Sequence, residues 1–148
     1  MQFQQVTQDN IEELYKINRE LAIEENQESL FTASLEKYRS GFVGEDKCAY
    51  GILAYQDADL IGFAILNYKF ATYLGYKALY IEDIFLKKPY LADDRKVEFL
   101  KYIIEIAEEN DCKRVEMRVL KEVNWGVELL KSLGFKDIEK WSVYRREV

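Results

Sequence analysis

Histidine is absent from this sequence of 148 residues. Histidine is the usual proton acceptor near neutral pH and the commonest metal ligand, so its absence excludes Ser-His and Cys-His catalytic pairs and histidine metal sites. Any proton transfer must use a carboxylate, tyrosine, lysine, cysteine or water. The two cysteines, Cys48 and Cys112, show no metal or redox spacing. We therefore expect two free thiols and no metal site.

Proline occurs once, and no low-complexity linker or internal repeat interrupts the chain. This pattern predicts a single domain over residues 1–148. No apolar run approaches the roughly 20 residues that a membrane helix needs, and the first ten residues do not resemble a signal peptide. We expect a cytoplasmic protein that does not enter a membrane.

Acidic residues outnumber basic ones by 27 to 21, which gives a net charge of -6. A negative field repels the nucleic-acid backbone, so a nucleic-acid partner is not expected. The same field weakly favours a cationic partner.

Apolar periodicity predicts alternating strands and helices, with a capping box at Asp9 and Glu12 and a hairpin turn at Asp57-Ala58-Asp59. Gly41, Pro89 and Gly134 are expected to end elements, and Asp93 or Asp94 to cap a helix. Strands are expected at residues 2–7, 49–55, 60–68, 78–86, 114–120 and 141–146, and helices over 9–22, 32–39, 94–110 and 125–133. Hairpins followed by β-α-β crossovers indicate an α+β fold with a mixed sheet and helices on its faces.

Four stretches in this order resemble the diamine (spermidine/spermine-like) branch of the GNAT N-acetyltransferases. They are Ile61-Gly62-Phe63-Ala64, Leu79-Tyr80-Ile81-Glu82-Asp83-Ile84-Phe85-Leu86, Lys131-Ser132-Leu133-Gly134-Phe135 and Trp141-Ser142-Val143-Tyr144-Arg145. The resemblance covers nearly the whole chain and is specific in combination. It implies a mostly antiparallel twisted sheet with a V-shaped split, acetyl-CoA bound at that split near Ile84, Phe85 and Leu86, a small amine as acceptor, and a homodimer.

Glu82 and Asp83 are adjacent acids in an otherwise apolar strand. In a regular strand they would face opposite sides, and one would be buried at a cost of several kcal/mol. A β-bulge with hydrogen-bonded acids or a functional cleft would explain both. By resemblance, Glu82 lies where the branch handles the amine proton, with Asp83 in support.

The acidic segment 24–30 follows the first helix. By resemblance, Glu25 and its neighbour Glu24 contribute to the amine pocket; the alternative is a solvated loop. Asn124 matches a residue that contacts the pantetheine arm of the cofactor, although asparagine also caps helices well.

The phosphate-binding loop departs from the family pattern of Arg/Gln-x-x-Gly-x-Gly/Ala. Here the stretch reads Leu91-Ala92-Asp93-Asp94-Arg95-Lys96 and contains no glycine. Arg95 and Lys96 are the cations that remain available to phosphates. Leu130 stands where the family has a tyrosine that protonates the leaving thiolate.

The sequence leaves three functions open. The first is acetyl transfer from acetyl-CoA to a small cationic amine. The second is a catalytically degenerate relative that acts as a binding or dimerisation module, with weak or no acetyl-CoA binding. The third is a different acyl-CoA user.

Overall fold

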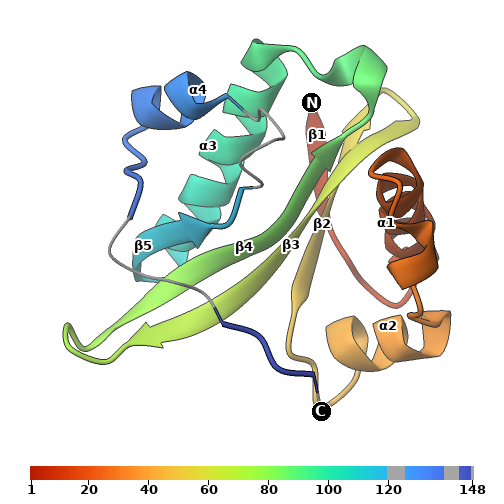
Figure 1. Cartoon of the computed structure of the whole chain (residues 1–148), viewed down its shortest axis with the longest axis horizontal. Helices are drawn as coiled ribbons and strands as arrows, with labels where there is room; N and C mark the ends of the chain where they lie inside the picture. The colour runs from red at the N-terminus through yellow and green to blue at the C-terminus, as the bar shows by residue number, and fades with distance from the viewer. Residues whose placement is uncertain (120–125, 139–143, 148) are drawn as a thin grey trace. The chain divides into compact units, whose positions relative to one another are not determined.

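The computed structural model describes residues 1–119, 126–138 and 144–147. These residues fall into two compact units, Met1–Arg118 and Val119–Val148. The first unit contains a sheet with helices on both faces (Figure 1). This arrangement confirms the expected α+β class.

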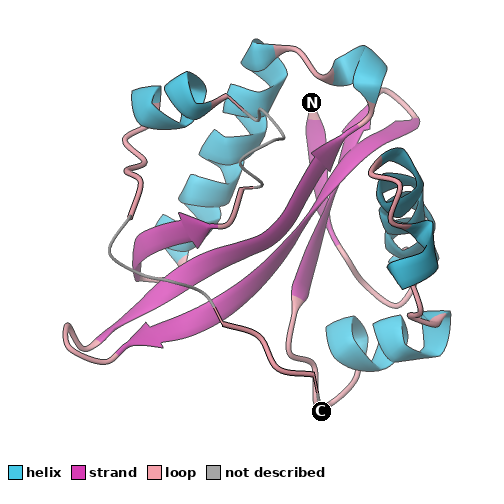
Figure 2. Cartoon of the chain, viewed as in Figure 1, coloured by secondary structure: helices cyan, strands magenta, loops and turns pink. Residues whose placement is uncertain are grey.

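The sheet of the first unit has the strand order β1-β2-β3-β4-β5. Its strands are β1 (Gln2–Gln5), β2 (Tyr50–Gln56), β3 (Asp59–Ala71), β4 (Tyr76–Leu86) and β5 (Cys112–Met117). The first four strands pair antiparallel, and β4 pairs with β5 in parallel. The parallel pair follows from chain order, because a helix connects β4 to β5 and returns the chain to the same end of the sheet. Figure 2 shows the long β3–β4 hairpin reaching beyond its neighbours.

Helices α1 (Ile11–Glu24) and α2 (Leu35–Val43) lie on one side of the sheet, and α3 (Asp93–Glu109) lies on the other (Figure 1). Short 3-10 turns, η1 (Glu28–Leu30) and η2 (Lys88–Tyr90), follow α1 and precede α3. The core on the α1–α2 side joins these helices to the sheet through Val6, Ile11, Leu14, Ile17, Tyr38, Ala49, Leu53, Phe63, Ile65 and Phe85.

The second core lies under α3, which buries Phe99, Leu100 and Ile103. The ring of Phe3 on β1 stacks on Phe99 at a centroid distance of 5.1 Å and on Tyr102 at 4.2 Å. The helical apolar pattern predicts α3 to within one residue at each end, because this stripe is long and regular.

The predicted capping box at Asp9 and Glu12 is wrong. Asn10 occupies the N-cap position of α1, and no side chain caps the helix. The Oδ1 atom of Asn10 instead accepts a hydrogen bond of 2.7 Å from the backbone N–H of Thr7. Asparagine favours such local loop bonds, and here one competes with the capping bond.

The second helix starts and ends later than the pattern predicts. Ser34 caps α2 by accepting a hydrogen bond of 3.3 Å from the N–H of Lys37. Gly41 lies inside this helix rather than ending it, and Gly44 occupies the C-cap. A glycine that packs without strain is tolerated in a helix, although it costs up to about 1 kcal/mol.

The start of α3 also differs from expectation. Ala92, in an extended conformation, is the N-cap, and no side chain caps the helix. Asp93 and Asp94 are its first two helical residues. There the helix dipole stabilises their negative charges without a capping bond.

The second unit contains α4 (Val127–Ser132), which Gly134 follows with a φ of 85°. This confirms the expected stop at Gly134. The predicted strand over residues 141–146 falls partly outside the described residues, and Tyr144–Arg146 are described without strand structure. Among the described helices, none is long and apolar enough to span a membrane.

Candidate active site

A β-bulge at Glu82 is the central feature of β4. Leu66 of β3 pairs with Ile81, but the preceding residue, Ile65, pairs with Asp83. Glu82 is therefore the extra residue on its strand, and the bulge breaks the alternation that would send adjacent side chains to opposite faces. The bulge resolves the conflict that two neighbouring acids pose in an apolar strand.

β4 and β5 part at the same place. Their last described pair is Ile81 with Met117. One residue further on each strand, Arg118 donates a hydrogen bond of 2.6 Å from Nη2 to Oε1 of Glu82. The ion pair is partly exposed, with 44% of the Arg118 side chain and 40% of the Glu82 side chain accessible.

Asp83 faces the α1–α2 side of the sheet. It pairs with Ile65, which belongs to the core on that side, and cross-strand partners share a face. The pKa of Asp83 is raised from 3.8 to about 6, mainly by burial and also by the charges of Glu82 and Glu25, while the charge of Arg118 opposes the shift. Such a carboxyl group can accept a proton near neutral pH.

Tyr38 of α2 lies near Asp83 and is missed by the sequence pattern. Its hydroxyl accepts a hydrogen bond of 2.7 Å from Nδ2 of Asn18 on α1. Burial raises the pKa of Tyr38 to about 12, and the charge of Asp83 contributes. Asn18 is a polar residue four positions after buried Leu14, and it interrupts the apolar stripe of α1. This interruption is the sequence signal that could have pointed to the partly buried hydrogen bond between Asn18 and Tyr38.

The two predicted substrate residues lie at the C-terminal end of α1, with Glu24 as its last residue and Glu25 at the C-cap, and they have different surroundings. Glu25 contributes to the raised pKa of Asp83. Glu24 points to Lys88 of η2, with 3.8 Å between Oε2 and Nζ. The charge of Glu25 therefore groups it with Glu82 and Asp83, and we call these three residues the acidic cluster. Glu24 has its ion-pair partner, Lys88, outside this cluster.

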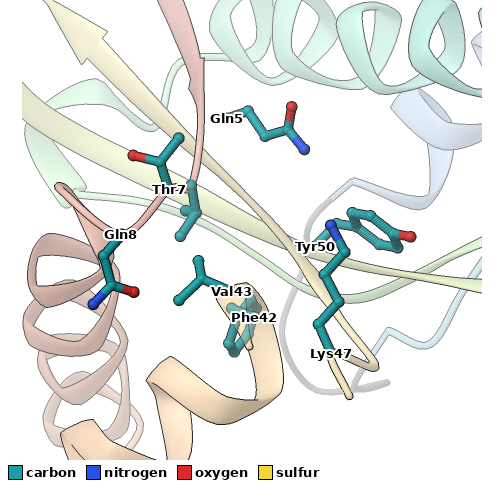
Figure 3. Close-up of a pocket in the computed structure, with 8 residues that line it drawn as sticks. Gln5, Thr7, Gln8, Phe42, Val43, Lys47 and Tyr50 are labelled. Atoms are coloured by element: carbon teal, nitrogen blue, oxygen red, sulfur yellow. The ribbon is translucent and has the colours of Figure 1, made fainter. Parts of the chain in front are cut away.

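A cavity of about 310 Å³ lies elsewhere in the first unit (Figure 3). It shares no residue with the acidic cluster and is lined by Gln5, Val6, Thr7, Gln8, Phe42, Val43, Lys47 and Tyr50. Its polar groups are neutral apart from Lys47, so it offers no proton acceptor.

Curated proteins similar to this chain include two thialysine N-epsilon-acetyltransferases. The protein from Sus scrofa is 26% identical over 145 residues, which cover 90% of this chain and 85% of that protein. The one from Caenorhabditis elegans is 24% identical and covers 96% of this chain and 89% of that protein. No protein-family model matches the chain.

Solved structures with the same architecture include a ribosomal-protein-alanine N-acetyltransferase from Brucella melitensis biovar Abortus 2308. It has a TM-score of 0.76 and 14% identity, and the likeness covers 100% of both chains. An aminoglycoside acetyltransferase from an uncultured soil metagenomic sample, in complex with sisomicin, has a TM-score of 0.82 and 10% identity over 99% of this chain and 95% of that one. The chain has the GNAT acetyltransferase fold. Its relatives in sequence are acetyltransferases as well, which supports an N-acetyltransferase enzyme.

GNAT acetyltransferases use acetyl-CoA in general as their co-substrate. The expected cofactor residues Ile84, Phe85 and Leu86 form the end of β4, beyond its last described pair with β5. Phe85 and Leu86 are buried, so their side chains belong to the cores rather than to an open site. This segment can offer a ligand its backbone N–H and C=O groups on the β5 side, because no described strand pairs with residues 84–86 there.

The two cations expected to meet phosphates both have protein partners. Arg95 donates a hydrogen bond of 2.9 Å from Nη1 to Oε1 of Gln56 and lies over the ring of Tyr90. Lys96 is buried, and its Nζ lies 3.1 Å from Oδ1 of Asp93. Asn124, the remaining expected cofactor residue, lies outside the described residues.

Proposed function

We propose that this chain transfers an acetyl group from acetyl-CoA to a small amine, at the acidic cluster on the β4 bulge. The observation that carries the proposal is the position of Asp83. It is a half-buried carboxyl with a pKa of about 6, next to Glu82 and within the influence of Glu25, at the place where β4 and β5 part. The names of the similar curated proteins support an amine as acceptor.

The chemistry requires a neutral amine, because an ammonium ion has no lone pair to attack a carbonyl carbon. In our proposal Asp83 takes the proton from the amine nitrogen. The nitrogen forms a bond to the acetyl carbon and gives its second proton to solvent, the carbon–sulfur bond breaks, and the thiolate leaves and takes a proton from solvent. General-base catalysis of this kind contributes about 10²- to 10⁴-fold, and is most effective when the pKa of the base is near the working pH.

The order of the two acids is part of the proposal. The family resemblance implies Glu82 as the proton acceptor with Asp83 in support. We propose the reverse, because Glu82 is held by Arg118 at 2.6 Å whereas the pKa of Asp83 is raised toward neutrality. Glu82 then acts mainly by holding charge beside the base.

For acetyl-CoA, the residues fit in part. The backbone edge at the end of β4, beside which no described strand lies, suits the amide groups of the pantetheine arm, and the first turn of α3, which no side chain caps, leaves backbone N–H groups for phosphate oxygens. Asp93 and Asp94 in that turn oppose a pyrophosphate through their charge. We therefore propose that acetyl-CoA binds with low affinity, assisted by Arg95, Lys96 and Asn124. Leu130, at the position of the family's tyrosine acid, is consistent with protonation of the thiolate by solvent, since a thiol pKa of roughly 8.5 makes it a fair leaving group.

The proposed dimer follows from the resemblance, whereas the single domain and the location follow from the sequence pattern. We propose that residues 1–148 act as one domain, that the chain forms a homodimer in the cytoplasm, and that its partner is a small amine rather than a nucleic acid or a membrane.

The experiment is an acetyl-transfer assay on the full chain, with acetyl-CoA and a panel of primary amines, in which release of the free thiol is followed. Asp83→Asn is expected to lower kcat by about 100-fold or more. Glu82→Gln and Glu25→Gln should mainly raise KM for the amine. The matched control is Glu24→Gln, next to Glu25 in sequence but paired with Lys88, which should change the rate less than twofold.

Binding of acetyl-CoA is measured separately by calorimetry. If no amine is acetylated and acetyl-CoA produces no heat of binding, the acetyltransferase proposal is wrong, and a binding or dimerisation role is favoured. Equal rates for Asp83→Asn and the wild-type chain would remove Asp83 from the mechanism.

A further inference from the structure

The ion pair between Arg118 and Glu82 occupies a special place in the sheet. Glu82 is bulged out of the β3–β4 ladder, and both residues lie one position beyond the last described β4–β5 pair. Neither residue therefore belongs to a described strand pair. The hydrogen bond of 2.6 Å joins residues 36 positions apart in the sequence.

Arg118 is also the cation that acts on the acidic cluster. Its charge lowers the pKa of Asp83, against the raising effects of Glu82 and Glu25. It acts in the same direction on Tyr80, whose pKa is raised mainly by burial. The acidic cluster with Arg118 thus holds three carboxyl groups and one fixed positive charge.

We propose that Arg118 determines the substrate charge that this site accepts, by holding Glu82 and disfavouring acceptors that carry a second positive charge. This inference rests on the proposed acetyl transfer at Asp83. A diamine whose one nitrogen reacts keeps its other nitrogen protonated. That ammonium ion would need a carboxylate partner, and Arg118 both occupies Glu82 and repels the ammonium ion.

The size of the effect follows from Coulomb's law. A unit charge several ångströms from a substrate ammonium, in partly exposed surroundings, changes affinity by about five- to tenfold. Removal of Arg118 should therefore favour a dication over a monocation by about that factor. Glu82 would gain a free carboxylate oxygen, which adds a charge-assisted hydrogen bond for the second ammonium.

The test compares two amines of matched length, 1,4-diaminobutane and 4-amino-1-butanol, in the acetyl-transfer assay at low salt. In the wild-type chain we expect the diamine to have no advantage in kcat/KM over the amino alcohol. Arg118→Leu should raise the ratio of the two kcat/KM values about five- to tenfold, mostly through a lower KM for the diamine. Arg118→Lys keeps the positive charge and should restore most of the wild-type ratio.

A pH profile provides a readout that loss of structure alone would not move. Asp83 is faced by Glu82 on its own strand, Glu25 after α1, Tyr38 on α2 and Arg118 after β5. Because Arg118 lowers the pKa of Asp83, the acidic limb of the kcat profile should move to higher pH in Arg118→Leu. The control is Arg39→Leu. Arg39 forms an ion pair with Glu12 in which 40% of the Arg39 side chain and 50% of the Glu12 side chain are accessible. This variant should change neither the ratio nor the profile.

Calorimetric binding of 1,4-diaminobutane separates this inference from the proposed function. If the wild-type chain acetylates amines but Arg118→Leu leaves the substrate ratio and diamine affinity unchanged, the role of Arg118 is wrong and acetyl transfer stands. If neither chain acetylates any amine and diamine binding is the same in both, both proposals fail. Tighter diamine binding by the folded variant supports the role of Arg118 whatever the turnover.

Discussion

Replacement of Asp83 by asparagine should stabilise the protein at neutral pH and leave its stability nearly unchanged in acid. The folded chain holds a proton on Asp83 with a pKa of about 6, whereas the ordinary value is 3.8. Since a tenfold change in proton affinity corresponds to about 1.4 kcal/mol, ionisation of Asp83 costs the folded state about 3 kcal/mol relative to the unfolded state. Partial solvent access reduces this figure to about 2 kcal/mol.

The direction follows from proton binding. A carboxyl with a raised pKa binds its proton more tightly in the folded chain, so the free energy of unfolding falls as pH rises from about 4 to about 6. Above pH 7 the full penalty is present, and asparagine removes it. Below pH 4 Asp83 is protonated in both states, and the amide has little effect.

The assay is urea unfolding, followed by circular dichroism, of Asp83→Asn and the wild-type chain at pH 4.0, 5.0, 6.0 and 7.5. The difference in free energy of unfolding should grow by about 2 kcal/mol over this range, which corresponds to roughly 4–8 °C in Tm. The exposed Asp46→Asn provides the control for the change of side chain. A difference that is constant with pH, or one that shrinks as pH rises, would refute the reasoning about the site.

Other predictions concern packing, the cofactor and assembly. Gly62→Ala would place a Cβ atom against the carbonyl oxygen of Phe85 and should cost roughly 2–4 kcal/mol in urea unfolding, whereas Gly41→Ala, with open space around it, should be neutral or stabilising. Asp94→Asn should tighten acetyl-CoA binding severalfold in calorimetry, and by more than Asp93→Asn, because Asp93 already has a lysine partner; equal affinities in all three chains would argue against the charge effect. Light scattering should give a mass near twice 17.5 kDa, and a monomer at micromolar concentration would contradict the proposed dimer.

Much of the fold is predictable from local sequence because its signals are local. The turn at Asp57 joins the two strands that were expected on either side of it, with Gln56 opposite Asp59. The apolar repeat of α3 places its ends to within one residue. Helix starts are less predictable: Asn10, Asp93 and Asp94 are all good capping residues, yet none of them makes a capping hydrogen bond, because nearby backbone geometry decides whether such a bond forms.

The sequence by itself determined that two neighbouring acids in an apolar strand need a special conformation, because burial of an unpaired carboxylate costs too much in a regular strand. It also indicated a mixed sheet and an acyl-transfer fold. It did not determine which acid has the perturbed pKa. That depends mainly on the burial of Asp83, and then on the charges of Glu25 after α1 and Arg118 after β5, which act on Asp83 only in the folded chain. Electrostatic effects depend on distance and burial rather than on sequence spacing, so only the tertiary structure decides them.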